Sequence, residues 1–281
     1  MNLFLAEGIT VVDHLKGRIN IMGAGAVGRT LGALWSQSGV LQVGEVLNRS
    51  LDSGQQAVDF MGAGRAVSDA SELQSADFYL LACPDDQIES CCQQLVNSGV
   101  LLLGAVVLHC SGAISSALLS SAAEQGALVA SMHPVRSFAG AVLAVEQFSG
   151  TYCGLEGDAE AVRRLDHLME SIGGIGFSID PMQKAVYHAA SVMACNYLVV
   201  LQEVSLQALE HSGVERELGM KILRPLVEGT VTNVFELGTS EALTGPIARG
   251  DSGVVAAQLT ALEAWRPEVA DLYRGLGREA L

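Results

Sequence analysis

The sequence predicts an α/β fold, with a doubly wound sheet domain over residues 1–180 followed by an all-helical domain over residues 181–281. Short strand-like runs alternate with helical stretches as far as about residue 180. These runs are almost continuously apolar, which is typical of parallel strands covered by helices on both faces. No strand pattern remains from residue 181 onward, and at 281 residues the chain is long enough for two domains.

Each strand expected in the first domain is a short apolar run. The first runs directly into a glycine-rich turn and a helix over 26–39, which Gly39 closes. Pro84 and the two aspartates after it suit the start of another helix. The expected strands cover residues 18–22, 43–48, 77–82, 105–110, 127–132, 150–155 and 175–180.

One long helical run opens the second domain. Asp180 suits the N-cap of this helix, Pro181 its first residue and Gly213 its end. The remainder of the chain continues in helical stretches without internal repeats. The sequence therefore predicts a helical domain of about a hundred residues.

Composition and charge narrow the function classes. Hydrophobic residues make up 49% of the chain and charged residues 17%, which indicates a globular protein. The net charge of −15 argues against a nucleic-acid partner, because phosphate binding needs a basic surface. The N-terminal stretch lacks the basic start of a signal peptide, and the longest apolar runs are shorter than the ~18 residues of a membrane span. We expect a soluble cytoplasmic protein without a membrane partner.

The cysteines follow no spacing typical of a disulfide framework or of a zinc site. We therefore expect buried or idle thiols in a reducing compartment, and no metal. The cysteines concerned are Cys83, Cys91, Cys92, Cys110, Cys153 and Cys195.

The pattern Gly23-x-Gly25-x-x-Gly28 lies between the first strand and its helix, which is the context of a dinucleotide-binding turn. Gly23 permits the tight turn, Gly25 lets the backbone approach a pyrophosphate, and Gly28 lets the helix pack on the sheet. The N-terminus of the helix then faces the negative charge. The expected cofactor contacts in this turn are Gly23, Ala24, Gly25, Ala26, Val27 and Gly28.

The end of the second strand indicates which dinucleotide is bound. An NAD site usually carries an acidic residue there for the ribose hydroxyl, but this chain has Asn48, Arg49 and Ser50. The planar guanidinium of an arginine suits a 2′-phosphate, so NADP is favoured over NAD. The alternative is that Arg49 is only a solvated loop residue. Cys83 and Pro84, after the strand 77–82, complete the expected cofactor site.

Two polar segments follow later strands of the predicted sheet. Ser111 comes after the strand 105–110, and His133 and Arg136 come after the strand 127–132. Ligands bind at the carboxyl ends of parallel strands, so these side chains are candidates to face the nicotinamide and a substrate. Histidine is a natural proton carrier there, whereas His109 lies within its strand and is expected to be a core histidine.

The long helix carries a further set of polar residues, and a polar stripe on an apolar helix calls for partners. At about 100° per residue, one face holds Lys184, His188, Ser191, Cys195 and Gln202, with Asn196 a third of a turn away. This face either lines a cleft against the nucleotide domain or forms a hydrated seam, and Lys184 near the helix start is alternatively exposed.

The segment "LTGPIARGD" (243–251) supplies another candidate. Arg249 projects from a stiff Gly-Pro turn, where its guanidinium would suit a substrate carboxylate or phosphate. The alternative assigns Arg249 to solvent and Asp251 to the N-cap of the following helix.

Taken together, these motifs resemble a family of predicted NADP oxidoreductases of unknown function. In this family a Rossmann-like domain precedes a helical domain similar to the C-terminal domain of 6-phosphogluconate dehydrogenase. The wider superfamily includes ketopantoate reductase, pyrroline-5-carboxylate reductase and the β-hydroxyacid dehydrogenases. The resemblance rests on the glycine turn and on the segments "NRS", "HCSG", "HPVRSF", "K-x-x-Y-H-A-A-S-V-x-A-x-N" and "TGPIARGD".

The resemblance also suggests catalytic roles. Lys184 matches the catalytic lysine of the β-hydroxyacid dehydrogenases, but His188 stands where they have an asparagine. His133 matches the catalytic histidine of prephenate dehydrogenases. The expected proton-transfer group is therefore His133 or Lys184, helped by His188 and Asn196.

The function expected is hydride transfer between NADP(H) and a small, anionic substrate in the interdomain cleft, with Ser111 and Arg249 holding the substrate. Two alternatives stay open: an NADP(H)-binding redox sensor without turnover, and an imine-reducing or deazaflavin-linked reductase. The sequence does not separate ketone from imine chemistry. A homodimer is expected, because helical domains of this superfamily often dimerise.

Overall fold

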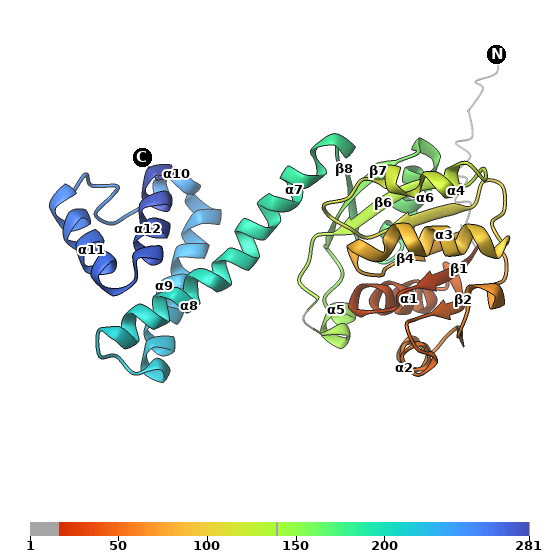
Figure 1. The fold of residues 1–281 in the computed structure, drawn as a ribbon, viewed down its shortest axis with the longest axis horizontal. Coiled ribbons are helices and arrows are strands. Elements are labelled where there is room, and N and C mark those ends of the chain that lie inside the picture. The colour runs from red at the N-terminus through yellow and green to blue at the C-terminus, as the bar shows by residue number, and fades with distance from the viewer. Residues whose placement is uncertain (1–16, 139, 281) are drawn as a thin grey trace, which may run out of the picture. The chain divides into compact units, whose positions relative to one another are not determined.

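The computed structural model describes residues 17–138 and 140–280, and the chain divides into two compact units, Met1–Ser191 and Val192–Leu281 (Figure 1). The first unit is built around one sheet, and the described residues of the second are helical. The division falls at residue 191 rather than at 180, because the first turn of the long helix is bound to the sheet through Lys184.

The sheet has the strand order β3-β2-β1-β4-β5-β6-β7-β8. The first six of these are parallel, which confirms the doubly wound fold expected from the alternating pattern. The strands are β1 (Gly17–Met22), β2 (Leu41–Leu47), β3 (Arg65–Val67), β4 (Phe78–Leu81), β5 (Val106–His109), β6 (Leu128–Pro134), β7 (Tyr152–Gly157) and β8 (Ile175–Ser178).

The last two strands depart from the expected parallel sheet. β7 runs antiparallel to β6, and β8 is parallel to β7. A parallel return would need a helical crossover along the sheet. Among the described residues between β6 and β7, the one helix is the short α5 (Ala141–Glu146), which packs against α1 (Ala26–Ser38). The chain therefore re-enters the sheet in the opposite direction.

Helices cover both faces of the sheet, and two hydrophobic clusters fill the space beneath them. One cluster contains Leu31 of α1 and Leu165 of α6 (Ala159–Glu170), and the Trp35 indole N–H donates to the Leu168 carbonyl at 3.2 Å. The other contains Leu95 of α3 (Ile88–Ser98). The remaining helices of this unit are α2 (Leu51–Met61), α4 (Ser120–Ala123) and α7 (Lys184–Ser191).

The long helix runs from Pro181 to His211, as the sequence predicts. The Asp180 carboxylate accepts a hydrogen bond from the Met182 backbone N–H at 2.9 Å, and Gly213 ends the run with φ +92°. A π-helical turn, Val192–Asn196, separates α7 from α8 (Tyr197–His211). The helices that follow are α9 (Arg216–Leu237), α10 (Thr239–Ala242), α11 (Ser252–Trp265) and α12 (Pro267–Glu279).

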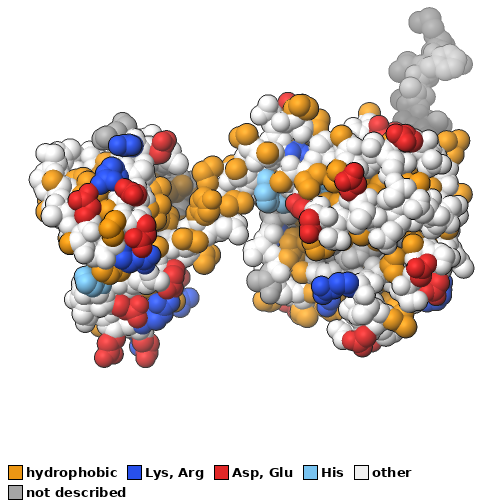
Figure 2. Space-filling view, viewed as in Figure 1, with side chains coloured by type: hydrophobic (Ala, Val, Ile, Leu, Met, Phe, Trp, Pro, Cys, Tyr) orange, Lys and Arg blue, Asp and Glu red, His pale blue; other side chains and the backbone are white. Residues whose placement is uncertain are grey.

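This long helix is also the one element, within the described residues, that is long and apolar enough to cross a membrane by length and composition. Its most apolar window has a mean hydropathy of 1.4, and only 6% of that window is buried. Polar residues interrupt the apolar runs of this helix, so no single run reaches the length of a membrane span. Figure 2 shows hydrophobic side chains at the surface of the helix. Its exposed apolar residues include Val186, Met193, Tyr197, Val199 and Val200.

Candidate active site

The glycine turn after β1 has the conformation that its sequence predicts. Gly23 adopts φ +89°, and a Cβ there would lie 2.5 Å from the Cys83 backbone nitrogen. A Cβ on Gly28 would lie 2.9 Å from the Gly23 carbonyl oxygen, so this glycine allows α1 to pack closely. By contrast, a Cβ on Gly25 would have no neighbour within 4 Å. The space beside Gly25 is open at the N-terminus of α1, where backbone N–H groups favour an anion.

The three residues after β2 have different surroundings: Asn48 and Ser50 are hydrogen-bonded, whereas Arg49 is exposed. Asn48 braces the glycine turn, because its Oδ1 accepts from the Ala24 backbone N–H at 2.6 Å and its Nδ2 donates to the Ser53 carbonyl at 2.9 Å. Ser50 is the N-cap of α2 and accepts from the Ser53 backbone N–H. Arg49 is exposed between them. Of the three, Arg49 is therefore the side chain free to meet a ligand.

Cys83 follows β4 beside this turn, and Pro84 after it is exposed. Cys83 interacts with Cys91 on α3, and this interaction lowers the pKa of the Cys91 thiol and, together with burial, raises the pKa of Cys83. The cysteines of the described residues form no disulfides.

Ser111 lies just past β5 and is almost completely buried. Its hydroxyl donates to the Asp85 carboxylate at 2.8 Å and accepts from the backbone N–H groups of Ala113 and Ile114. The His109 Nδ1 accepts from the Ser111 backbone N–H at 3.1 Å. His109 is fully buried, and burial lowers its pKa to about 4, so it is the core histidine that the sequence predicts.

His133 lies within the end of β6 rather than in the loop that follows. Its Nδ1 is 2.8 Å from the hydroxyl oxygen of Tyr187 on α7, and the rings of Tyr187 and His188 both meet it edge to face. Burial, followed by the charges of His188 and Lys184, lowers the pKa of His133 to about 4. Burial also raises the pKa of Tyr187 to about 12.

Gly112 packs directly against two histidines. A Cβ at Gly112 would lie 2.4 Å from the His188 Nδ1 and 2.8 Å from the His133 Nε2, so only glycine fits without a shift of the rings. Both ring nitrogens therefore lie against this glycine, and we call the three residues the histidine notch (Gly112, His133, His188). The His188 Nδ1 is buried without a hydrogen-bond partner in the described part of the chain.

Lys184 is 1% exposed, so it is neither solvated nor free. Its ammonium donates to the Ser111 carbonyl at 2.9 Å, to the Glu156 carboxylate at 3.2 Å and to the Ser131 hydroxyl. These three acceptors match the three protons that an ammonium carries. Burial lowers the pKa of Lys184, while Glu156 opposes that shift. The arrangement binds α7 to the sheet.

Other predicted residues lie apart from this cluster or have local partners. The Arg136 guanidinium donates to the Gln147 side chain at 2.7 Å and to the Thr151 hydroxyl at 3.3 Å. The shared face predicted beyond Ser191 assumed uniform rotation along the helix, and the π-helical turn breaks it. Asn196 ends that turn and is exposed.

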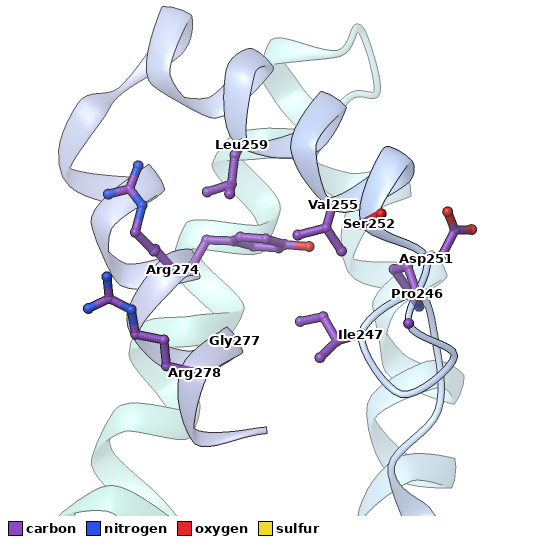
Figure 3. A pocket seen from close by; sticks show the side chains of 11 residues that line it. Pro246, Ile247, Asp251, Ser252, Val255, Leu259, Arg274, Gly277 and Arg278 are labelled. Carbon is purple, nitrogen blue, oxygen red and sulfur yellow. The ribbon is translucent and has the colours of Figure 1, made fainter. Parts of the chain in front are cut away.

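Arg249 is exposed in the helical unit, and the Asp251 carboxylate accepts from the Val254 backbone N–H as the N-cap of α11. The loop beside it borders an apolar pocket of about 270 Å³ (Figure 3). Its lining includes Pro246, Ile247, Tyr273 and Arg278, but not Arg249.

Two family models match the chain, one over its N-terminal part and one over its C-terminal part. Residues 9–134 match the Rossmann-like domain, and residues 151–280 match a domain of unknown function, DUF2520. Over these two stretches the chain is similar to a Rossmann-like domain followed by a DUF2520 domain. No curated protein matches it.

Solved structures share this architecture. The putative NADP oxidoreductase BF3122 of Bacteroides fragilis has a TM-score of 0.76 at 20% identity, covering 95% of this chain and 98% of its own. Protein TM1727 of Thermotoga maritima has a TM-score of 0.69 at 28% identity, covering 93% and 98%. An imine reductase of Myxococcus stipitatus in complex with NADP⁺ has a TM-score of 0.65 at 16% identity, covering 94% and 93%. Pyrroline-5-carboxylate reductases are also among the matches, one of them with NADP bound, so the fold is shared with NADP-binding proteins.

The sequence analysis did not identify several residues of the Rossmann-like unit that surround the predicted ones. Tyr187 stands within the segment "K-x-x-Y-H", next to His188, and Gly112 within "HCSG", yet neither was assigned a role. Asp85 and Glu156 were also missed. The single available signal for Tyr187 was its helical spacing of three from Lys184, and its contact with β6 depends on tertiary packing.

Proposed function

We propose that this protein is an NADP-dependent oxidoreductase that transfers a hydride between NADP(H) and a small, anionic organic substrate. The observation that carries the proposal is that the glycine turn and the histidine notch follow strands of one parallel sheet, at the same carboxyl edge. Ligands bind at that edge in open α/β sheets. A cofactor turn and a proton-carrying pair there are the two parts that hydride chemistry needs.

The residues after β1 and β2 suit the cofactor. The open space at Gly25 and the free N–H groups of α1 fit a pyrophosphate, and the exposed Arg49 suits a 2′-phosphate. Bound NADPH supplies the hydride. That relatives of the same fold bind NADP supports this choice.

The residues of the notch suit the substrate. The ring nitrogens of His133 and His188 lie against the same glycine, Gly112, and Ser111 and Asp85 lie in the same unit. Within the proposal, His133 handles the proton and Lys184 holds β5, β6, β7 and α7 in place. Asn196 and Arg249 belong to the second compact unit, Val192–Leu281, so the core of the proposal does not depend on them.

An Arg49→Glu variant tests the cofactor assignment. The change replaces an attraction for the 2′-phosphate by a repulsion, so NADPH should bind roughly ten- to hundredfold more weakly, while NADH binding stays the same. Fluorescence titration of both nucleotides measures this, with Arg224→Glu, an exposed arginine of α9, as the matched control. An unchanged preference for NADPH removes Arg49 from the site. NADPH binding without oxidation by any keto acid or cyclic imine would favour the redox sensor.

We propose in addition that the protein forms a homodimer, with a second copy covering the exposed apolar side of the long helix. The helix exposes Val199 and Val200, and α9 exposes Leu226 and Phe235, and contiguous apolar surface of this kind marks a site that another protein covers. An ion pair between Glu203 of this helix and Arg216 disfavours lipid as the alternative cover. Light scattering of the purified protein at twice the chain mass supports the dimer, and a monomer contradicts it.

A further inference from the structure

We propose that Tyr187 is a positioning residue that holds His133 in the tautomer protonated at Nε2. The tautomer itself depends only on residues of the first unit, Met1–Ser191. The consequence for catalysis rests on the proposed function: in this tautomer His133 can donate the Nε2 proton to a substrate atom that carries a lone pair.

The direction of the hydrogen bond between Tyr187 and His133 follows from the proton count. The tyrosine hydroxyl has one proton, and burial keeps that proton on it at neutral pH, since the pKa of Tyr187 is raised to about 12. The Nδ1 of His133, at 2.8 Å, is its acceptor in the described residues. The reverse direction would leave the hydroxyl proton without a protein acceptor there.

His133 is neutral under the same conditions, because burial lowers its pKa to about 4. A neutral imidazole carries one N–H and one lone pair. If Nδ1 accepts from Tyr187, the proton of His133 is on Nε2. The groups that act on this ring are Tyr187, His188 and Lys184 of α7 and Asp85 after β4, and none of them donates to Nε2.

The Nε2 of His133 lies beside Gly112, since a Cβ on Gly112 would lie only 2.8 Å from it. A substrate atom that approaches Nε2 as a hydrogen-bond acceptor must offer a lone pair to the Nε2–H. Carbonyl and hydroxyl oxygens and a neutral imine nitrogen all do so, so the tautomer gives His133 the role of proton donor in the reducing direction.

For a carbonyl substrate, the proton transfers balance through Tyr187 and His133. In the reducing direction the substrate carbon gains the hydride, and the substrate oxygen gains the proton on the His133 Nε2. The Tyr187 proton moves to Nδ1, and water returns a proton to the phenolate oxygen. A carbonyl thus becomes an alcohol while NADPH becomes NADP⁺, and the reverse sequence oxidises the alcohol. A neutral histidine that polarises a carbonyl is known to be effective when its pKa is lowered.

Nitrogen NMR of the full chain with ¹⁵N-labelled histidine tests the tautomer without any substrate. We expect His133, assigned with His133→Gln, to be protonated at Nε2 at pH 7. In Tyr187→Phe both tautomers should be populated, whereas the control Tyr197→Phe, an exposed tyrosine of α8, should leave the spectrum unchanged. A proton on Nδ1 in the unaltered protein overturns the proposal, and so does a spectrum that Tyr187→Phe does not change. If Tyr187→Phe fails to fold, the spectrum of the unaltered protein still shows which ring nitrogen of His133 carries the proton.

NADPH oxidation with a panel of small keto acids and cyclic imines tests the role of Tyr187 in turnover. For the substrate that is reduced, we expect kcat/KM to fall roughly ten- to hundredfold in Tyr187→Phe, with the Kd of NADPH unchanged. Equal kcat/KM in Tyr187→Phe and the unaltered protein would overturn the positioning role. Failure of NADPH to bind at all would instead refute the proposed function and leave the tautomer result standing.

Discussion

The ammonium nitrogen of Lys184 lies 3.2 Å from the Glu156 carboxylate, and both side chains are almost completely buried. Glu156 also accepts from the Ser116 backbone N–H at 2.8 Å and from the Ser116 hydroxyl at 2.7 Å. The pair thus connects α7 to β7 and to the turn after β5. Because each proton of the Lys184 ammonium is hydrogen-bonded, we infer that Lys184 supports the fold and that His133 transfers the proton.

Removing one partner of this pair should be costly, because the other charge stays buried. We predict that Lys184→Met lowers the free energy of unfolding by about 3–5 kcal/mol. The double variant Lys184→Met/Glu156→Gln should regain much of that loss, since no bare charge remains and glutamine keeps a bond to Ser116. Urea denaturation followed by circular dichroism measures both, and a Lys184→Met protein as stable as the original would contradict the structural role.

Gly112→Ala should close the histidine notch. The new Cβ would lie 2.4 Å from the His188 Nδ1 and 2.8 Å from the His133 Nε2, so one or both rings must shift. We expect turnover to fall at least tenfold, while NADPH affinity is kept because the glycine turn is untouched. Gly253→Ala of α11 is the control, since its Cβ meets nothing within 4 Å. Full activity of Gly112→Ala would show that no substrate atom uses the notch.

His109 should make the protein less stable in acid. Its folded pKa of about 4 lies below the ordinary value of 6.5, so between these values the unfolded chain binds a proton that the folded chain does not. Stability from this residue is complete above pH 6.5 and is lost as the pH falls toward 4, by on the order of 3 kcal/mol. In His109→Asn the asparagine side-chain oxygen can still accept the hydrogen bond from the Ser111 backbone N–H, but the side chain no longer titrates.

Urea denaturation at a series of pH values from 7 to 4 measures this difference. The original protein should lose more stability than His109→Asn over that range, and the remaining loss includes His133, whose pKa is lowered in the same way. Parallel curves for the two proteins would refute the assignment.

Cys91 should react as a more acidic thiol than usual. Because Cys83 lowers the pKa of Cys91, alkylation of Cys91 by iodoacetamide should reach half its maximal rate at a lower pH than in Cys83→Ala. In Cys83→Ala the midpoint should move up toward about 8.5, the ordinary value for a thiol. Peptide mass spectrometry resolves each cysteine, and the buried Cys92 is the slow internal control. The same midpoint in both proteins would contradict the effect of Cys83 on Cys91.

The parts of this fold that were predictable are those fixed by local backbone needs. Gly23 and Gly28 are required by a tight turn and by close packing, and Asp180, Pro181 and Gly213 mark helix ends through local hydrogen bonds and dihedral angles. Such requirements are visible in a few adjacent residues. The doubly wound fold follows from them and from the apolar strands.

The remaining features depend on contacts between segments that are distant in the sequence. The reversal of β7 depends on where the chain re-enters the sheet, and the burial of Lys184 depends on Glu156, 28 residues away. The contact of Tyr187 with His133 spans 54 residues. The π-helical turn shifts the face on which the residues after Ser191 lie, and uniform periodicity does not reveal it.

Calorimetry of the purified protein with NADP⁺, NADPH, NAD⁺ and NADH tests the central claim most directly. The account predicts that the phosphorylated pair binds in preference, because Arg49 is exposed at the end of β2 where a 2′-phosphate would lie. Binding of neither pair, or equal binding of both, would contradict it: the first result would remove the oxidoreductase proposal, and the second would remove the choice of NADP.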